Sequence, residues 1–224
     1  MMKNIFQVFY GLLVLVLYSS CGHSEEENVD VFIVGGSASG VTSGIQSARM
    51  GANTLIIEES TWLGGMLTSA GVSAVDGNYK LPAGLWGEFK DRLSDYYGGL
   101  DSLKTGWVSN VLFEPSVGNK IFYEMVAAEN NLKVWKQACL EEIKKTGNEW
   151  VAKVKVEGQP VKTVRAKIVI DATELGDVAK MCGVKYDIGM ESRDDTHEDI
   201  APEKKNNIVQ DITYVAILKD YGKE

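Results

Sequence analysis

The sequence predicts an α/β fold in which helices pack on a parallel sheet and a β-meander is inserted late in the chain. An apolar run at residues 31–34 leads into a glycine-rich turn and then a helical pattern, as in a buried strand with its crossover helix. A second apolar run, at residues 54–57, follows that helix. Three segments with strand-like alternation, at residues 138–145, 150–156 and 161–170, are separated by turn residues and predict the meander.

The glycine-rich turn, residues 35–40 (GGSASG), is the stretch around which the other elements are arranged. Gly35 is expected to make the tight strand-to-helix turn, and Gly40 to let the helix pack closely on the strand. Free N–H groups at the start of the helix, together with its dipole, form a site for a pyrophosphate group. The residues predicted to bind there are Gly35, Gly36, Ser37, Ser39 and Gly40.

An acidic residue ends the second predicted strand. Glu58 lies 23 positions after Gly35, where a carboxylate accepts hydrogen bonds from ribose hydroxyls and disfavours a 2′-phosphate. Glu59 follows directly and is included in the predicted site. Ser37 stands at the middle glycine position of the G-x-G-x-x-G pattern, where its hydroxyl can donate to the pyrophosphate or cap the helix. Together these features predict a Rossmann-like dinucleotide-binding unit.

Two later stretches are expected at the same edge of the sheet. Adjacent glycines in the segment L-G-G-M-L let the backbone pass close to a ligand, so Gly64, Gly65 and Met66 are predicted to contact the cofactor. The apolar strand that ends at residue 170 runs into Asp171, Ala172 and Thr173. The carboxyl ends of such strands are where open α/β sheets bind ligands, so these residues join the predicted site.

Other patterns predict the remaining organisation. Further elements are expected as helices at residues 85–97, from Pro115 onward and at 178–182, and as strands at 132–135 and 183–187. Residues 29–190 are expected to form the dinucleotide-binding domain. A charged loop at 191–207 and a strand-like tail at 208–221 indicate that residues 191–224 begin a second, substrate domain that is incomplete here.

The N-terminus is typical of an export signal. Residues 1–20 hold one lysine followed by an apolar stretch too short for a stable membrane span, which predicts a signal peptide. The sequence Tyr18-Ser19-Ser20-Cys21 resembles a bacterial lipobox, whose cysteine is lipidated. We therefore expect lipidation of Cys21, a polar tether at residues 21–28 and an exported, membrane-anchored lipoprotein. The alternative is a plain signal peptide cut elsewhere.

Composition excludes some partners. From Cys21 onward, 22 basic and 31 acidic residues leave a net charge of −9, which argues against binding to nucleic acid or to an anionic membrane surface. The membrane contact expected is the lipid anchor alone. Cys139 and Cys182 make no disulfide framework and no metal spacing, and buried free thiols are expected. With His23 and His197 as the only histidines, no metal site is predicted.

These motifs, in this order, resemble the glutathione-reductase-type FAD fold. The similarity is most specific to the bacterial FAD-dependent oxidoreductase family, with its GG-S/T-x-x-G turn and L-G-G-M-L motif, and it covers residues 29–221. It implies a Rossmann-like FAD-binding domain. The glycine turn would contact pyrophosphate, Glu58 the adenosine ribose, and the L-G-G-M segment the pyrophosphate and isoalloxazine. The backbone near Cys139 would meet adenine, and residues 171–173 with Asp177 would close over the cofactor.

The resemblance also implies a function. We expect an oxidoreductase that passes a hydride or electrons between a small organic substrate and an acceptor through non-covalent FAD, since no histidine lies between Glu58 and Val75. The substrate and the catalytic acid or base are unidentified. An NAD-binding dehydrogenase is an alternative, although the meander and the L-G-G-M segment favour FAD. A further alternative is a non-catalytic surface lipoprotein linked to glycan acquisition.

Overall fold

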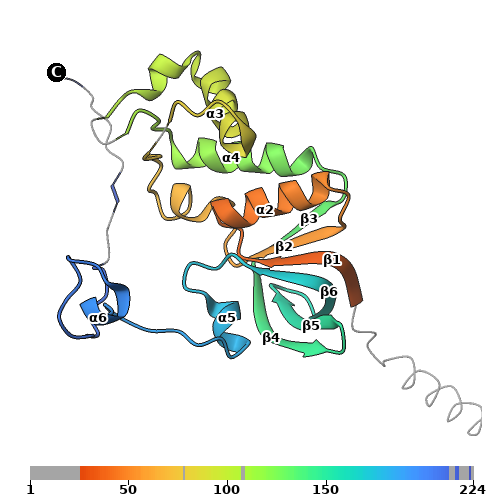
Figure 1. The fold of residues 1–224 in the computed structure, drawn as a ribbon. Coiled ribbons are helices and arrows are strands. Elements are labelled where there is room, and N and C mark those ends of the chain that lie inside the picture. The colour runs from red at the N-terminus through yellow and green to blue at the C-terminus, as the bar shows by residue number, and fades with distance from the viewer. Residues whose placement is uncertain (1–25, 78, 107–108, 212–214, 217–221, 223–224) are drawn as a thin grey trace, which may run out of the picture.

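The computed structural model describes residues 26–77, 79–106, 109–211, 215–216 and 222, and it contains one six-stranded sheet in the order β3-β2-β1-β6-β5-β4 (Figure 1). The strands are β1 (Glu26–Val34), β2 (Thr54–Glu58), β3 (Leu132–Lys136), β4 (Ala138–Thr146), β5 (Glu149–Val156) and β6 (Lys162–Asp171). Strands β3, β2, β1 and β6 pair in parallel, whereas β5 runs antiparallel to both β6 and β4. The predicted parallel sheet with an inserted meander is therefore confirmed.

The described helices are α2 (Ala38–Arg49), α3 (Gly84–Tyr97), α4 (Pro115–Ala127), α5 (Asp177–Met181) and α6 (Arg193–Thr196), with short 3₁₀ helices η1 (Gly65–Leu67) and η2 (Leu100–Leu103). Helices α2, α3 and α4 cover one side of the sheet, whereas α5 packs through Val178 into the core on the other face. Figure 1 shows α2, α4 and α3 on the same side, while β4 and β5 curl away on the other. In the described part of the chain, no helix combines the length and the apolar character needed to cross a membrane.

The alternation of side chains along β1 explains why both faces of the sheet are covered. Val31 and Ile33 pack in the core beneath the helices, and Phe32 and Val34 pack in a second core with the meander. All four are at most 6% exposed. The small face predicted for the first helix is also buried, as its members Val41, Gly44, Ile45 and Ala48 lie within α2. The central unit of the fold thus follows from its hydrophobic pattern.

The first strand is longer than its apolar run. Residues 26–28 pair with residues 163–165 of β6, so the prediction that they belong to a polar tether is wrong. Backbone pairing needs no apolar side chain, and charged partners across the strands support it. The Glu26 carboxylate lies 2.6 Å from Nε of Arg165, and the Glu27 carboxylate 2.6 Å from Nζ of Lys133. Residues 1–25, which hold the predicted signal peptide and Cys21, lie outside the described residues.

The strand predicted at residues 183–187 is also wrong. This segment has the alternation of a strand, but it pairs with no other strand among the described residues, and Val184 and Tyr186 are exposed. Without a neighbouring strand, an alternating pattern has no ladder to join. In the predicted tail strand, residues 208–211 and 215–216 are not in a strand, and its other residues lie outside the described part of the chain.

Candidate functional site

A cavity of about 250 Å³ opens at the carboxyl ends of β1, β2 and β6. Its walls include these predicted site residues: Gly35, Ser37, Glu58, Glu59, Gly65, Ala172, Thr173 and Asp177. They come from four separate stretches of the chain, which the parallel topology brings to one edge of the sheet. The carboxyl-end location expected from the sequence is therefore the one that the structure shows.

Two glycines of the turn are required by close backbone approach. Gly35 has a φ of +103°, and a Cβ there would lie 2.4 Å from the carbonyl oxygen of Ala172. A Cβ on Gly40 would lie 2.0 Å from the carbonyl oxygen of Gly35. Both distances are far below van der Waals contact, and the obstructing atoms are backbone. The tight turn and the close helix–strand packing expected at these positions are present.

Ser37 caps the helix that follows the turn. It is the N-cap residue of α2, and its Oγ accepts a hydrogen bond from the Gly40 N–H at 3.3 Å. The same hydroxyl donates to the Ala172 carbonyl oxygen at 2.9 Å and lies 2.9 Å from Oγ of Ser39. Of the two roles considered for this serine, the structure shows the cap. It also links the glycine turn to the segment after β6.

Glu58 is held in place by the backbone on both sides of its strand. One carboxylate oxygen accepts from the Gly36 N–H at 2.7 Å, and the other accepts from the Ser60 N–H at 2.8 Å. A carboxylate has about four acceptor positions, so two bonds leave capacity for further donors. Glu58 lines the cavity from the tip of β2. Its predicted contact with a ribose is compatible with this placement and stays a prediction.

The L-G-G segment lies directly against the glycine turn. The Gly64 N–H donates to the Gly36 carbonyl oxygen at 2.7 Å, and Gly64 forms a parallel bridge with Ser37. A Cβ on Gly65 would lie 3.1 Å from Cα of Ser37 and 2.6 Å from a carboxylate oxygen of Glu174. Gly64 and Gly65 both have positive φ, at +109° and +53°. This backbone-to-backbone contact explains why side chains are absent here.

Met66 and Cys139 lie beside the cavity without lining it. Met66 follows Gly65 in η1 and is 57% exposed. Cys139 sits in β4 between Ala138 and Leu140, which do line the cavity. Burial, followed by the negative charges of nearby glutamates including Glu59, raises the pKa of the Cys139 thiol. The chain near Cys139 thus borders the cavity through Ala138 and Leu140, and its predicted contact with adenine stays a prediction.

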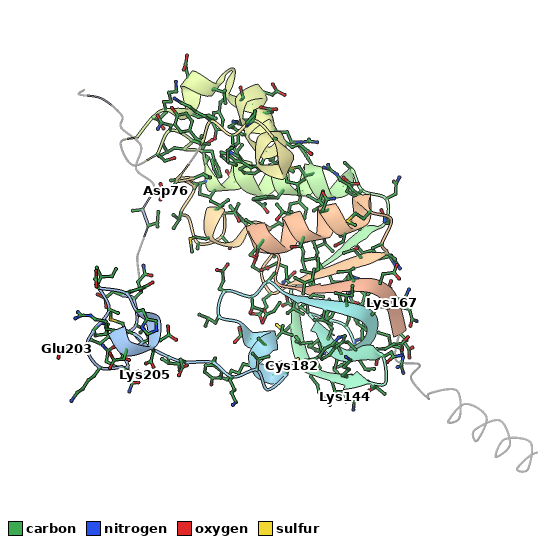
Figure 2. All side chains as sticks on the ribbon, viewed as in Figure 1. Asp76, Lys144, Lys167, Cys182, Glu203 and Lys205 are labelled. Carbon is green, nitrogen blue, oxygen red and sulfur yellow. The ribbon has the colours of Figure 1, made fainter. Side chains whose placement is uncertain are left out.

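Both described cysteines are free and exposed, so the expectation of buried thiols is wrong. In β4, the residue before Cys139 is buried and Cys139 itself is exposed, as alternation along a strand requires. Cys182 caps the end of the short helix α5, at the edge of the described fold (Figure 2). Within the described residues, no group of three or more His, Cys, Asp and Glu side chains is arranged to hold a metal ion.

Asp171 organises the loop after β6 instead of lining the cavity. One of its oxygens accepts from Thr173 N–H at 3.0 Å and Oγ at 2.7 Å, and the other accepts from Ala179 N–H at 2.8 Å. The Thr173 hydroxyl in turn accepts from the Asp177 N–H at 2.8 Å. Burial acts to raise the pKa of Asp171, but these hydrogen bonds outweigh it and lower the pKa below 3.8. The loop that presents Ala172 and Thr173 is therefore pinned by a carboxylate.

Several cavity residues were not predicted. These are Val34, Ile57, Ser69, Ala138, Leu140, Glu174 and Leu175. Glu174 lies between the predicted site residues Thr173 and Asp177, and Ala138 and Leu140 flank Cys139. Including the sequence neighbours of each predicted residue would therefore have found these three. Among the described residues that line the cavity, every charged one is acidic. An anionic ligand here must be held by N–H groups and the helix dipole.

Comparison with known protein families gave a match over most of the chain. A family model described as "FAD dependent oxidoreductase" matches residues 30–223. This match covers nearly the whole chain, including the glycine turn, Glu58, the L-G-G-M segment and the loop after β6. A comparison with curated protein sequences gave no match.

Solved structures share the fold at low sequence identity. The chain is similar to p-nitrophenol 4-monooxygenase PnpA from Pseudomonas putida DLL-E4, with a TM-score of 0.53 and 15% identity over 74% of this chain and 46% of that one. A flavoprotein/dehydrogenase from Cytophaga hutchinsonii gives a TM-score of 0.53 and 17% identity over 70% of this chain and 42% of that one. OxyS anhydrotetracycline hydroxylase from Streptomyces rimosus gives a TM-score of 0.52 and 12% identity over 73% of this chain and 36% of that one. The chain spans less than half the length of each.

Proposed function

The chain belongs to the FAD-dependent oxidoreductase family, and from this premise we propose that it forms the cofactor-binding part of a flavoenzyme that oxidises or reduces a small organic molecule. The observation that carries the proposal is the cavity at the carboxyl ends of β1, β2 and β6. There the glycine turn, Glu58, Gly65 and the loop after β6 converge, and each has the chemistry that one portion of a dinucleotide requires.

The residues present fit FAD in three respects. The N-terminus of α2, a helix of 12 residues, faces a turn without bulky side chains and suits a pyrophosphate group. Glu58 is positioned by two backbone donors and retains acceptor positions for ribose hydroxyls. Gly65 lines the same cavity and places no side chain in it.

When bound, FAD supplies the hydride and electron chemistry through its isoalloxazine ring. This chain's own residues bind and orient it. The N–H groups at α2 hold the pyrophosphate, Glu58 accepts from the ribose, and the acidic lining disfavours an additional phosphate group. The loop pinned by Asp171 keeps Ala172 and Thr173 against the turn through the Ser37 hydroxyl. The attachment is non-covalent.

Purification of the full chain tests the proposal. Protein expressed with riboflavin should carry flavin absorbance that is released on denaturation and identified as FAD by chromatography. The apo protein, titrated with FAD and separately with NAD, should bind FAD with a saturable change in flavin fluorescence. A protein that binds NAD but not FAD, or neither, would contradict it.

Export and lipid anchoring belong to the same proposal. Support comes from the sequence at residues 1–21, with its apolar stretch and its lipobox-like ending at Cys21. The enzyme would then work outside the cytoplasm, attached through lipid on Cys21. Labelling of the cells with radioactive palmitate should mark the protein, and the substitution Cys21→Ser should abolish the label. Equal labelling of both forms would refute the anchor.

A further inference from the structure

A second cavity, of about 620 Å³, lies on the helical side of the molecule. Its walls come from residues 71–74, the end of α3, the region of η2, and residues 112–115 at the start of α4. The described tail residues Val215 and Ala216 also border it. Its volume falls within the range of small-molecule sites, roughly 300–1,000 Å³. None of the motifs predicted from the sequence accounts for this cavity.

The two cavities share one short segment of chain. Gly65 and Ser69 line the first cavity, and residues 71–74 line the second. The segment is fixed by its own hydrogen bonds, since the Ala70 N–H donates to the Gly65 carbonyl oxygen at 3.2 Å and the Val72 N–H to that of Met66 at 3.0 Å. A ligand in the second cavity therefore lies next to the chain that follows the proposed FAD contact.

The walls of the second cavity are largely apolar and well supported. Ala74 and Leu112 form an antiparallel bridge, and the Phe113 N–H donates to the Ser73 carbonyl oxygen at 3.2 Å. The Phe113 ring packs edge-on against Phe89 in the core, with ring centroids 5.5 Å apart. This apolar wall is therefore anchored to the main core and is suited to an apolar ligand surface.

One polar pair stands at this cavity. The Tyr97 hydroxyl accepts from the Glu114 N–H at 2.9 Å and lies 3.2 Å from the Glu114 carboxylate, to which it donates. Burial raises the pKa of the Tyr97 hydroxyl above its ordinary value, and the negative charge of Glu114 adds to this shift. Glu114 is the charged side chain of the described lining, and one hydrogen bond leaves its carboxylate with further acceptor positions.

We propose that this cavity is the substrate site of the oxidoreductase and that it binds a small organic amine, whose ammonium group pairs with Glu114 and whose apolar body packs against Leu112 and Phe113. The proposal rests on the function proposed above. A carboxylate favours a cation and repels an anion, and Leu112 and Phe113 supply apolar lining beside it. No cationic side chain among the described lining residues competes for Glu114.

The test measures binding of three matched probes to the full chain, with and without FAD, by calorimetry at neutral pH. Glu114 is exposed, so benzylamine should bind about three- to fivefold more tightly than benzyl alcohol or benzoate, the scale of an exposed ion pair. Glu114→Gln should weaken benzylamine binding by about the same factor and leave benzyl alcohol unchanged. Asp101→Asn, at an exposed acid of η2 outside the lining, is the matched control and should change nothing.

Folding and alternative occupants are covered by the same design. The Glu114 side chain does not cap α4, so the Glu114→Gln variant should fold. If that variant does not fold, Ser102→Phe is the second test, because its ring fills the cavity and should abolish benzylamine binding. Equal affinity for the three probes, or an unchanged Glu114→Gln variant, overturns the proposal. Loss of benzylamine binding upon FAD loading also overturns it, because the flavin would then occupy this cavity. Failure of the proposed function shows separately, as a lack of FAD binding.

Discussion

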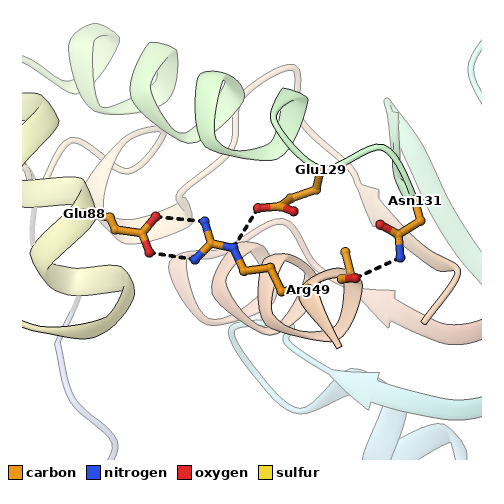
Figure 3. Close-up of polar contacts among 5 residues, drawn as sticks. Arg49, Glu88, Glu129 and Asn131 are labelled. Atoms are coloured by element: carbon orange, nitrogen blue, oxygen red, sulfur yellow. Dashed lines mark hydrogen bonds and ion pairs between the residues drawn. The ribbon is translucent and has the colours of Figure 1, made fainter. Parts of the chain in front are cut away.

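The two ends of α2 are built in opposite ways. At its N-terminus, the chain contributes glycines, small hydroxyl side chains and backbone N–H groups, and the cavity there is lined with acids. At its C-terminus, the helix ends in Arg49, and long charged side chains tie it to α3 and to the loop after α4 (Figure 3). One end is left open to a ligand, and the other is closed by the protein itself.

Side-chain hydrogen bonds hold the closed end of α2. Arg49 donates to both carboxylate oxygens of Glu88 in α3, at 2.6 and 2.8 Å, and through Nε to Glu129 beyond α4 at 2.7 Å. These hydrogen bonds raise the pKa of Arg49, and the one to Glu88 has the largest effect. In turn, the hydrogen bond from Arg49 lowers the pKa of Glu88. Asn131 donates to the Ala48 carbonyl oxygen at 2.9 Å and so satisfies the helix end.

This difference teaches that the helix is anchored away from its binding end. The ties at Arg49 position α2 relative to α3 and α4, so the N-terminus needs no bulky side chain to hold it. Bare backbone at the cavity is then available for a ligand. Substitutions at the two ends should consequently separate cofactor binding from stability, and three experiments test that separation.

The largest effect is expected from Gly40→Ala. Its Cβ would lie 2.0 Å from the Gly35 carbonyl oxygen, and backbone cannot move aside cheaply. We expect FAD retention to be lost and the free energy of unfolding to fall by about 1–3 kcal/mol, the scale of overpacking. The matched control is Gly44→Ala in the same helix, where the new Cβ meets the flexible end of Ile56 at 2.6 Å. Denaturant melts and flavin content measure both, and similar behaviour of the two variants would show that the turn is not the sensitive point.

A smaller effect is expected from Glu58→Ala. Loss of the carboxylate removes the proposed ribose acceptor and frees the Gly36 and Ser60 N–H groups, so FAD affinity should fall by about 1–3 kcal/mol. Titration of the apo protein with FAD measures this. Glu129→Ala removes a carboxylate at the closed end of α2 and should leave FAD affinity unchanged. Full cofactor retention in Glu58→Ala would remove Glu58 from the site.

The smallest effect is expected from Arg49→Met. The ion pairs are partly exposed, with 34% of the Arg49 side chain accessible, so the loss in unfolding free energy should be about 1 kcal/mol. FAD affinity should not change. Arg92→Met is the control, since Arg92 lies 3.9 Å from Glu124 in an exposed pair and should cost less. A loss of FAD affinity in Arg49→Met would contradict this separation, because it would mean that the contacts at the C-terminus of α2 also determine cofactor binding at its N-terminus.

Much of the fold could be predicted because its signals are local. The apolar run of β1, the glycine turn and the small face of α2 lie within one short stretch, and each fixes a backbone conformation or a buried face. The predicted meander strands agree with β4, β5 and β6 to within one residue at each end, because Gly147 and Gly158 mark the reversals with positive φ. Convergence of the distant motifs on one sheet edge follows from parallel topology.

What could not be predicted depends on partners distant in sequence. Residues 26–28 extend β1 only because β6 lies beside them. Residues 183–187 do not form a strand because, among the described residues, no strand lies beside them. The sequence predicts Asp171 as a site residue, yet its carboxylate oxygens accept hydrogen bonds from Thr173 and Ala179 instead. The Tyr97–Glu114 pair joins two helices across a loop, and no spacing rule connects these positions. Hydrogen-bond partners of this kind are set by tertiary packing.

The acidic lining of the first cavity has a consequence for how binding responds to ionic strength. Sites that hold phosphates with lysine or arginine weaken as salt screens the attraction. In the proposed site, neutral N–H dipoles would supply the attraction at close range, whereas the surrounding carboxylates repel an anion over longer distances. Counter-ions weaken the long-range repulsion more than the short-range contacts, so added salt should tighten the hold on a dinucleotide.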